Sequence, residues 1–252
     1  MGADDDVLIG GFIIDGNAPK QVLLRAIGPS LKVNEVPLAN ALQDPTLELH
    51  DSQGLLLSSN DDWRISQEGD ILATNLAPPD DRESAILCTL MPGSYTAILR
   101  GKDGTTGIGL VEVYDLGTAS LNVESQTQLV NISTRGKVET GDDVMIGGFI
   151  IGGNSPSDVL IRALGPELTG QGVAGALQDP ELELHDSNGK VLAFNDDWAS
   201  DQEAEIFFTN LAPSNPHESA ILSSLAPGSY SATVFGKNGS TGIALVEVYV
   251  LP

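Results

Sequence analysis

Short apolar runs separated by turn residues dominate the pattern of hydrophobic and polar positions along this chain. The runs VLIGGFII (7–14) and VLLRAI (22–27) are rich in branched side chains and are bounded by Gly, Asn or Pro, which predicts buried strands. Residues 105–114 alternate between two faces with the period of a strand. We therefore expect a chain built mainly from short β-strands.

Turn signals join these strands into hairpins. Residues 46–58 alternate around Ser-Gln-Gly, and residues 181–193 carry Asn-Gly at the same place, which is a strong hairpin signal. Residues 83–101 predict two strands joined by a Pro-Gly turn. Only 66–78 and 201–213 have the pattern of a helical turn, with acidic residues near the start and Pro at the end.

The whole pattern occurs twice. Residues 7–17 return as 144–154, and residues 44–116 align without a gap to 179–251, where 45 of 73 positions are identical. Each copy is too long for one rung of a solenoid and long enough for its own core, so we expect two separate domains.

The number and spacing of the strands predict the fold. About eight short strands per copy, with no alternation of strands and helices, indicate an all-β protein. We predict two tandem β-sandwich domains of jelly-roll-like form, residues 1–117 and 129–252. A polar linker, residues 118–128, would join them.

The charge narrows the range of partners. Thirty-five acidic against twelve basic residues give a formal net charge of -23. Such a surface repels nucleic-acid phosphates and anionic lipids, and no apolar run approaches the length of a membrane span, so we expect neither nucleic-acid binding nor membrane insertion. The charge suits solubility, cation binding or a place outside the cell in salty surroundings. The one cysteine, Cys88, is expected to be a small buried apolar residue.

Several motifs together resemble known extracellular domains. LVNISTRG, VLIRALGP, LQDPELELHDSNG, NDDW and TGIALVEVY are similar to a tandem repeat of about 135 residues in large secreted proteins of environmental bacteria. This resemblance implies an extracellular accessory module and no particular reaction. Through L-x-L-x-D-x-x-G and L-x-P-G-x-Y, the second half of each copy more distantly resembles the bacterial pre-peptidase C-terminal domain. That resemblance implies a β-sandwich that accompanies secreted proteases and polysaccharide-degrading enzymes.

Catalysis needs a nucleophile or a carboxylate pair with a base in reach. The histidines, aspartates and serines that could supply these groups fit surface and turn positions better than catalytic ones. His50 and His185 precede turn-initiating aspartates, and His217 has no histidine counterpart in the other copy. Ser84 and Ser219 lack the glycines of a nucleophile elbow. We therefore expect a protein that is not an enzyme.

The sequence Asn-Asp-Asp-Trp occurs once in each copy and is the best candidate for a ligand site. Calcium takes six to eight oxygens, so one triplet supplies at most about half a shell. Further oxygens would come from Asp51, from Glu83 or from backbone carbonyls, and in the second copy from Asp186 or Glu218. The other interpretation is a turn capped by Asn60 and Asp61 and anchored by Trp63. The calcium candidates are Asn60, Asp61, Asp62, Asn195, Asp196 and Asp197.

The two tryptophans are also the only serious candidates for a carbohydrate platform. If they are exposed, Trp63 and Trp198 would give each copy one platform and allow weak bivalent binding. The four tyrosines lie in alternating strands and are expected in the core or in strand pairs.

The stretch before the second copy has no counterpart before the first. If residues 129–136 are the first strand of the domain, the first copy has an open edge that invites strand addition from a neighbouring molecule. Alternatively, the chain is cut from a longer array, or the stretch is the last strand of the first copy. The candidate assembly strand consists of Leu129, Val130, Asn131, Ile132, Ser133, Thr134, Arg135 and Gly136.

These features predict a secreted or cell-surface protein that acts as a non-catalytic structural or adhesive repeat. Its partners would be other copies of itself or further repeats of the parent chain. The alternative is a carbohydrate-binding accessory module of a secreted polysaccharide-degrading enzyme, with polysaccharide as the partner. The sequence suggests no cofactor other than calcium.

Overall fold

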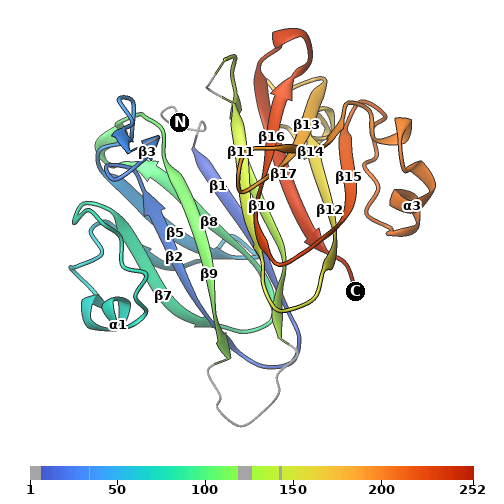
Figure 1. Ribbon diagram of the computed structural model, residues 1–252. Coiled ribbons are helices and arrows are strands. Elements are labelled where there is room, and N and C mark those ends of the chain that lie inside the picture. The colour runs from blue at the N-terminus through green and yellow to red at the C-terminus, as the bar shows by residue number, and fades with distance from the viewer. Residues whose placement is uncertain (1–6, 34, 119–126, 142–143) are drawn as a thin grey trace. The chain divides into compact units, whose positions relative to one another are not determined.

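Antiparallel β-sheets form both halves of the chain (Figure 1), which confirms the all-β prediction. The computed structural model describes residues 7–33, 35–118, 127–141 and 144–252. Most of the expected linker, residues 119–126, lies outside the described residues. None of the described helices is long and apolar enough to cross a membrane.

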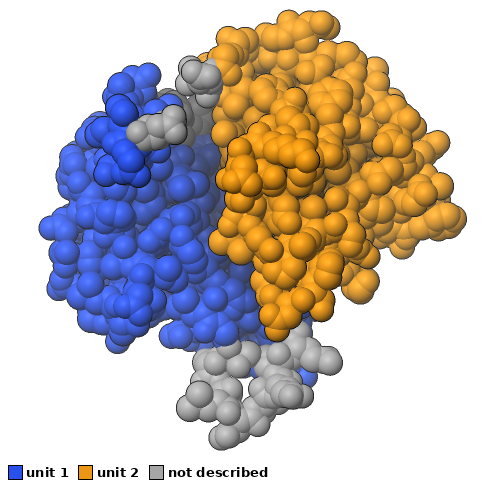
Figure 2. Space-filling view, viewed as in Figure 1, with its two compact units in different colours: residues 1–130 blue, residues 131–252 orange. Residues whose placement is uncertain are grey.

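The chain divides into two compact units, unit 1 of residues 1–130 and unit 2 of residues 131–252, which Figure 2 shows in different colours. Two sheets pack face to face in unit 1. The first sheet has the order β1 (Leu8–Asp15), β8 (Gly93–Gly101), β5 (Pro45–Asp51) and β6 (Leu56–Asn60). The second has the order β7 (Ser84–Leu90), β2 (Lys20–Ile27) and β9 (Leu110–Thr118). The remaining elements are a short hairpin of β3 (Lys32–Val33) and β4 (Val36–Pro37), helix α1 (Glu68–Ala73) and the 3-10 turn η1 (Lys102–Gly104).

Unit 2 repeats this arrangement with one more strand. Its first sheet has the order β11 (Met145–Ile151), β16 (Gly228–Gly236), β13 (Pro180–Asp186) and β14 (Val191–Asn195). Its second has the order β15 (Ser219–Leu225), β12 (Ser157–Leu164), β17 (Gly242–Val250) and the part of β10 (Gln128–Val138) that lies in unit 2. The helices are α2 (Pro166–Gly170), α3 (Glu203–Phe208) and the 3-10 turns η2 (Trp198–Ser200) and η3 (Lys237–Gly239). Eight strands in two antiparallel sheets are the arrangement of a jelly roll.

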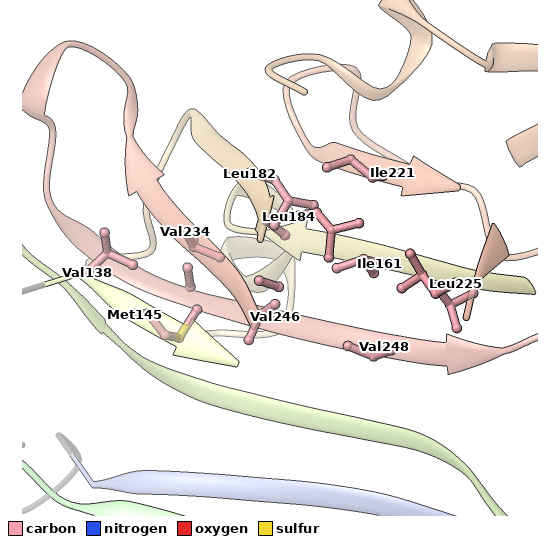
Figure 3. Close-up of a cluster of buried hydrophobic side chains, with 14 of the residues drawn as sticks. Val138, Met145, Ile161, Leu182, Leu184, Ile221, Leu225, Val234, Val246 and Val248 are labelled. Atoms are coloured by element: carbon pink, nitrogen blue, oxygen red, sulfur yellow. The ribbon is translucent and has the colours of Figure 1, made fainter. Parts of the chain in front are cut away.

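The core of each unit lies between its two sheets, and strand alternation builds it. In unit 2, Leu182 and Leu184 of β13 are fully buried, while Glu181 and Glu183, which alternate with them, are partly exposed. These leucines pack with side chains of the other sheet, among them Ile161, Val246 and Val138 (Figure 3). The period of two read from the sequence therefore corresponds to an inner and an outer face of each strand.

The two predicted helical turns are confirmed as α1 and α3. Each begins after a glutamine with positive φ, Gln67 at 58° and Gln202 at 56°. Each buries one residue, Ile71 or Ile206, against the outer face of the second sheet, where a second and smaller core forms. This smaller core is where the repeated Asn-Asp-Asp-Trp sequence lies.

Candidate functional site: the Asn-Asp-Asp-Trp turn and strand β10

Asn60, the last residue of β6, holds the turn that carries the two aspartates. Its Oδ1 accepts a hydrogen bond from the Ala85 amide at 2.9 Å, and its Nδ2 donates to the Asp62 carbonyl at 3.2 Å. Asn195 makes the equivalent bonds in unit 2. In both copies the asparagine amide is therefore engaged by the backbone, as in a capped turn.

Trp63 closes the small core beside α1. It is 1% exposed and packs against Leu23 and Ile71. Its indole N–H donates to the Asp80 carbonyl at 3.1 Å, and the guanidinium carbon of Arg64 lies 4.1 Å from the ring centroid. Trp63 is an anchor of the fold, and it does not have the exposure that a carbohydrate platform requires.

Trp198 occupies the same place in unit 2 but is only partly buried, beside Leu160 and Ile206. Its indole nitrogen has no hydrogen-bond partner within the described part of the chain. Ala199 stands where unit 1 has Arg64, so the side chain that covers Trp63 has no counterpart here. The carbohydrate hypothesis therefore applies to Trp198 alone.

Three carboxylates gather at the turn of unit 1. One oxygen each of Asp44, Asp61 and Asp62 lies within 4.8 Å of the others. Nζ of Lys102 lies 2.7 Å from Asp61 Oδ2 and 3.7 Å from Asp44 Oδ2. The hydrogen bond to Asp61 raises the pKa of Lys102, while burial and then the charge of Asp61 raise the pKa of Asp62. A lysine thus partly neutralises the cluster.

Unit 2 has the same arrangement. Nζ of Lys237 lies 2.6 Å from Asp196 Oδ2 and 3.6 Å from Asp179 Oδ2. Asp197 also comes close to Asp179 and to His217, whose Nδ1 is 3.4 Å from Asp197 Oδ1. The repetition makes the lysine–aspartate cluster a property of the domain.

Calcium fits these clusters only in part. Three carboxylates supply about half of its coordination shell, and the lysine fills the space between two of them. Five aspartate oxygens of these clusters are nevertheless buried without a hydrogen-bond partner among the described residues, namely Oδ1 of Asp44, Asp61, Asp179, Asp196 and Asp197. The lysines contact Oδ2 of Asp44, Asp61, Asp179 and Asp196, so a calcium ion at these oxygens would compete with a positive charge that is already in place.

The further oxygens that the sequence suggested are engaged elsewhere. Glu83 is fully buried, with Oε1 accepting from the Gly28 and Ser30 amides at 3.1 and 3.0 Å and Oε2 accepting from the Asp80 amide at 3.1 Å. Asp51 caps its own hairpin turn through two backbone amides. Both carboxylates hold loops in place and lie outside the aspartate cluster.

Glu218, the counterpart of Glu83, is also fully buried. It accepts hydrogen bonds from the Gly165 amide at 2.7 Å and the Glu167 amide at 2.8 Å. Burial raises the pKa of Glu218 to about 7, and the Glu167 carboxylate acts in the same direction, while the two amides and Arg162 oppose them. Unit 2 thus contains a buried carboxyl group that titrates near neutral pH.

The residues considered for catalysis have structural partners. Ser84 and Ser219 are fully buried and donate to backbone carbonyls; Ser84 Oγ lies 2.6 Å from the Pro45 carbonyl oxygen. Nε2 of His50 lies 3.0 Å from Glu48 Oε2, and the same pair recurs in unit 2. No described histidine is among the hydrogen-bond partners of these serines.

An ion pair repeated in both units was not found from the sequence. Nε of Arg25 donates to Glu112 Oε2 at 2.8 Å across β2 and β9, and its other nitrogens reach Tyr114 Oη and the Leu76 carbonyl. Arg162 makes the same contacts in unit 2. The available signal is an arginine inside an apolar strand at the same position of both copies, opposite a strand with the sequence Glu-Val-Tyr.

Strand β10 contains the candidate assembly strand, and the two units share it. Leu129 packs against the core of unit 1, and Thr127 Oγ1 accepts a hydrogen bond from the Ala18 amide at 3.1 Å. Residues 131–138 belong to unit 2 and form eight antiparallel residue pairs with β17. Asn131 is buried, and Val138 is a fully buried member of the core.

Comparisons with known proteins find similarity to solved structures. No protein-family model and no curated protein matches the chain. A crystal structure of the pre-peptidase C-terminal domain of a collagenase from Bacillus anthracis is similar over 47% of this chain and 89% of that domain, with 16% sequence identity and a TM-score of 0.31. It is the kind of domain that the motifs resemble. The resemblance to repeats of environmental bacteria stays a prediction.

Proposed function

We propose that this chain is a non-catalytic, extracellular structural or adhesive module. Its two units would be successive repeats of a larger surface assembly, joined to neighbouring repeats by strand addition. The acidic net charge of -23 and the motifs shared with secreted repeats support the location.

One observation carries the proposal: the polar residues that both copies share are used to hold the fold. Glu83 binds backbone amides, Ser84 binds backbone carbonyls, Asn60 caps a turn and Arg25 pairs with Glu112, each with an equivalent in unit 2. Buried polar groups with complete hydrogen bonding favour one rigid structure. A rigid structural or spacer domain needs polar residues that hold its loops and strands together in this way.

The proposal is tested by combining a mechanical measurement with a search for ligands and turnover. When the chain is stretched in single-molecule experiments, we expect two separate unfolding steps, each releasing about 40 nm of chain. We expect no cleavage of general peptidase or glycosidase substrates. Cleavage that persists after repurification and is lost in Ser84→Ala or Glu218→Gln would contradict the proposal.

The second candidate function is carbohydrate binding by unit 2, and the partial exposure of Trp198 is the observation that favours it. Aromatic rings with an open face are the usual contact for apolar faces of sugars. Pull-down on insoluble polysaccharides distinguishes the candidates. Retention that is lost in Trp198→Ala, with Trp198→Phe as the aromatic control, would favour the carbohydrate module, whereas no retention by the unaltered chain would favour the structural role.

A further inference from the structure

The second sheet of unit 1 ends one strand earlier than its counterpart in unit 2. β9 pairs with β2 on one side and, within the described ranges, with no strand on the other, whereas β17 lies between β12 and β10. Both strands carry the sequence LVEVY, at residues 110–114 and 245–249. The strands β9 and β17 therefore share the sequence LVEVY, but among the described strands only β17 has a neighbour at this edge.

The uncovered edge leaves apolar side chains in solvent. Leu110 is 39% and Ile108 36% exposed, whereas their counterparts Leu245 and Ile243 are half-buried. On the other face of the strand, Val111 and Val113 are half-buried, whereas their counterparts Val246 and Val248 are 2% and 6% exposed. β9 also begins at Leu110, three residues later than β17 when the copies are aligned. An unpaired strand with apolar side chains is a template for another strand.

We propose that the free edge of β9 binds a strand of the β10 type, supplied by the leading segment of a further repeat; this inference rests on the structural role proposed above. The register follows from unit 2, where Asn131 lies opposite Tyr249 and Val138 opposite Gly242. With the offset of 135 between the copies, the incoming strand runs antiparallel to β9, with its asparagine opposite Tyr114 and its arginine opposite Leu110.

The chemistry of the incoming strand also matches the acceptor. The segment NISTRGKV of β10 has two basic residues and no carboxylate, while the chain as a whole has a net charge of -23. Arg135 lies opposite Leu245 in unit 2. In unit 1 the same arginine would lie opposite Leu110, which is exposed enough to accept a charged side chain in its place.

A fluorescent peptide of residues 128–138, titrated into the full chain and followed by anisotropy, tests the proposal. Directly opposed charges on neighbouring strands attract or repel, so Leu110→Glu should tighten binding about threefold and Leu110→Lys should weaken it by about the same factor. A peptide with Arg135→Glu should reverse that order. The same substitutions at Leu245, where β10 already covers the strand, are the matched control and should leave the affinity unchanged.

Saturable binding that follows the charge at position 110 would support the proposal. Binding no stronger than that of a scrambled peptide would overturn it. Dependence on position 245 would overturn it as well, because the peptide would then be displacing β10. Circular dichroism melts identify any variant that fails to fold. A failure here leaves the non-catalytic structural role intact, since stretching and substrate assays test that role separately.

Discussion

Nζ of Lys102 lies 2.7 Å from Oδ2 of Asp61, and Lys237 and Asp196 make the same contact at 2.6 Å in unit 2. The lysine supplies the positive charge at a place where a metal ion would otherwise bind the carboxylates. We therefore expect millimolar calcium to leave the melting temperature of the unaltered chain unchanged relative to a chelated sample. In the double variant Lys102→Met/Lys237→Met, calcium at tenfold excess over its Kd should raise the melting temperature by about 5 °C.

The control for the lysine variants is Lys190→Met, which removes one positive charge from an exposed turn of unit 2 away from the cluster. This variant should melt at the same temperature with calcium and with chelator. A calcium-dependent melt of the unaltered chain would mean that calcium displaces the lysines. Identical melting temperatures of the double variant with calcium and with chelator would contradict calcium binding at the aspartate clusters.

Glu218 makes the stability of unit 2 depend on pH in an unusual direction. Burial raises its pKa from the ordinary value of 4.5 to about 7, so the folded state holds the proton more tightly than the unfolded state. The contribution of this group is therefore fully present below pH 4.5 and is lost as the pH rises through 7. The expected loss is at most about 3 kcal/mol of unfolding free energy. Urea unfolding at pH 5 and pH 8, followed by the fluorescence of Trp198 in a Trp63→Phe background, measures it.

Two variants isolate Glu218 from the other carboxylates. Glu218→Gln should flatten this part of the pH dependence, because the amide does not titrate. Glu167→Gln should shift the transition to lower pH, because it removes a like charge that raises the pKa of Glu218. An unchanged difference between pH 5 and pH 8 in Glu218→Gln would assign the pH dependence to another group.

Most of the fold could be predicted from the sequence because strands have a period of two and turns have characteristic residues. Leu182 and Leu184 are buried as the alternation indicates, and Asp186 caps the Asn-Gly hairpin. The pairing of β10 was not predictable. Its residues are polar on average, so local pattern does not say whether they join the strand before or after them. In the structure, residues 131–138 pair with β17 and belong to unit 2.

The candidate site was predictable only in part. The repeat identified Asn60 and Trp63 as turn and anchor, and both have that role in the structure. The lysine in the cluster was missed because Lys102 is 41 residues beyond Asp61. The two come together only because β5 pairs with β6 on one side and with β8 on the other. The local pattern of hydrophobic and polar residues does not predict contacts between residues so far apart in the sequence.

The two tryptophans are expected to contribute unequally to stability. Trp63 is 1% exposed with its N–H bonded, so Trp63→Ala should cost unit 1 about 3–5 kcal/mol. Trp198 is partly exposed with an unpartnered N–H, so Trp198→Ala should cost unit 2 clearly less. Urea unfolding followed by far-ultraviolet circular dichroism gives both values. The prediction fails if the two losses are equal.

The repeated arginine pair should matter more in unit 2 than in unit 1. The side chains of Arg162 and Glu247 are 13% and 11% exposed, and those of Arg25 and Glu112 are 13% and 22% exposed, because β10 covers β17 and no described strand covers β9. Removing one member of a buried pair leaves an uncompensated charge, so Arg162→Met should cost about 3–5 kcal/mol. The equivalent Arg25→Met should cost less, since water reaches its glutamate.

The double variant Arg162→Met/Glu247→Leu separates the charge from the shape of the site. With both charges gone, the site becomes apolar, and much of the lost stability should return even though the bond from Arg162 to the Leu211 carbonyl is absent. Urea unfolding of the two single variants and the double variant completes the cycle. If the double variant is as unstable as the sum of the single variants, the pair contributes through packing and the Leu211 contact, and the buried charge is not what makes the single variants unstable.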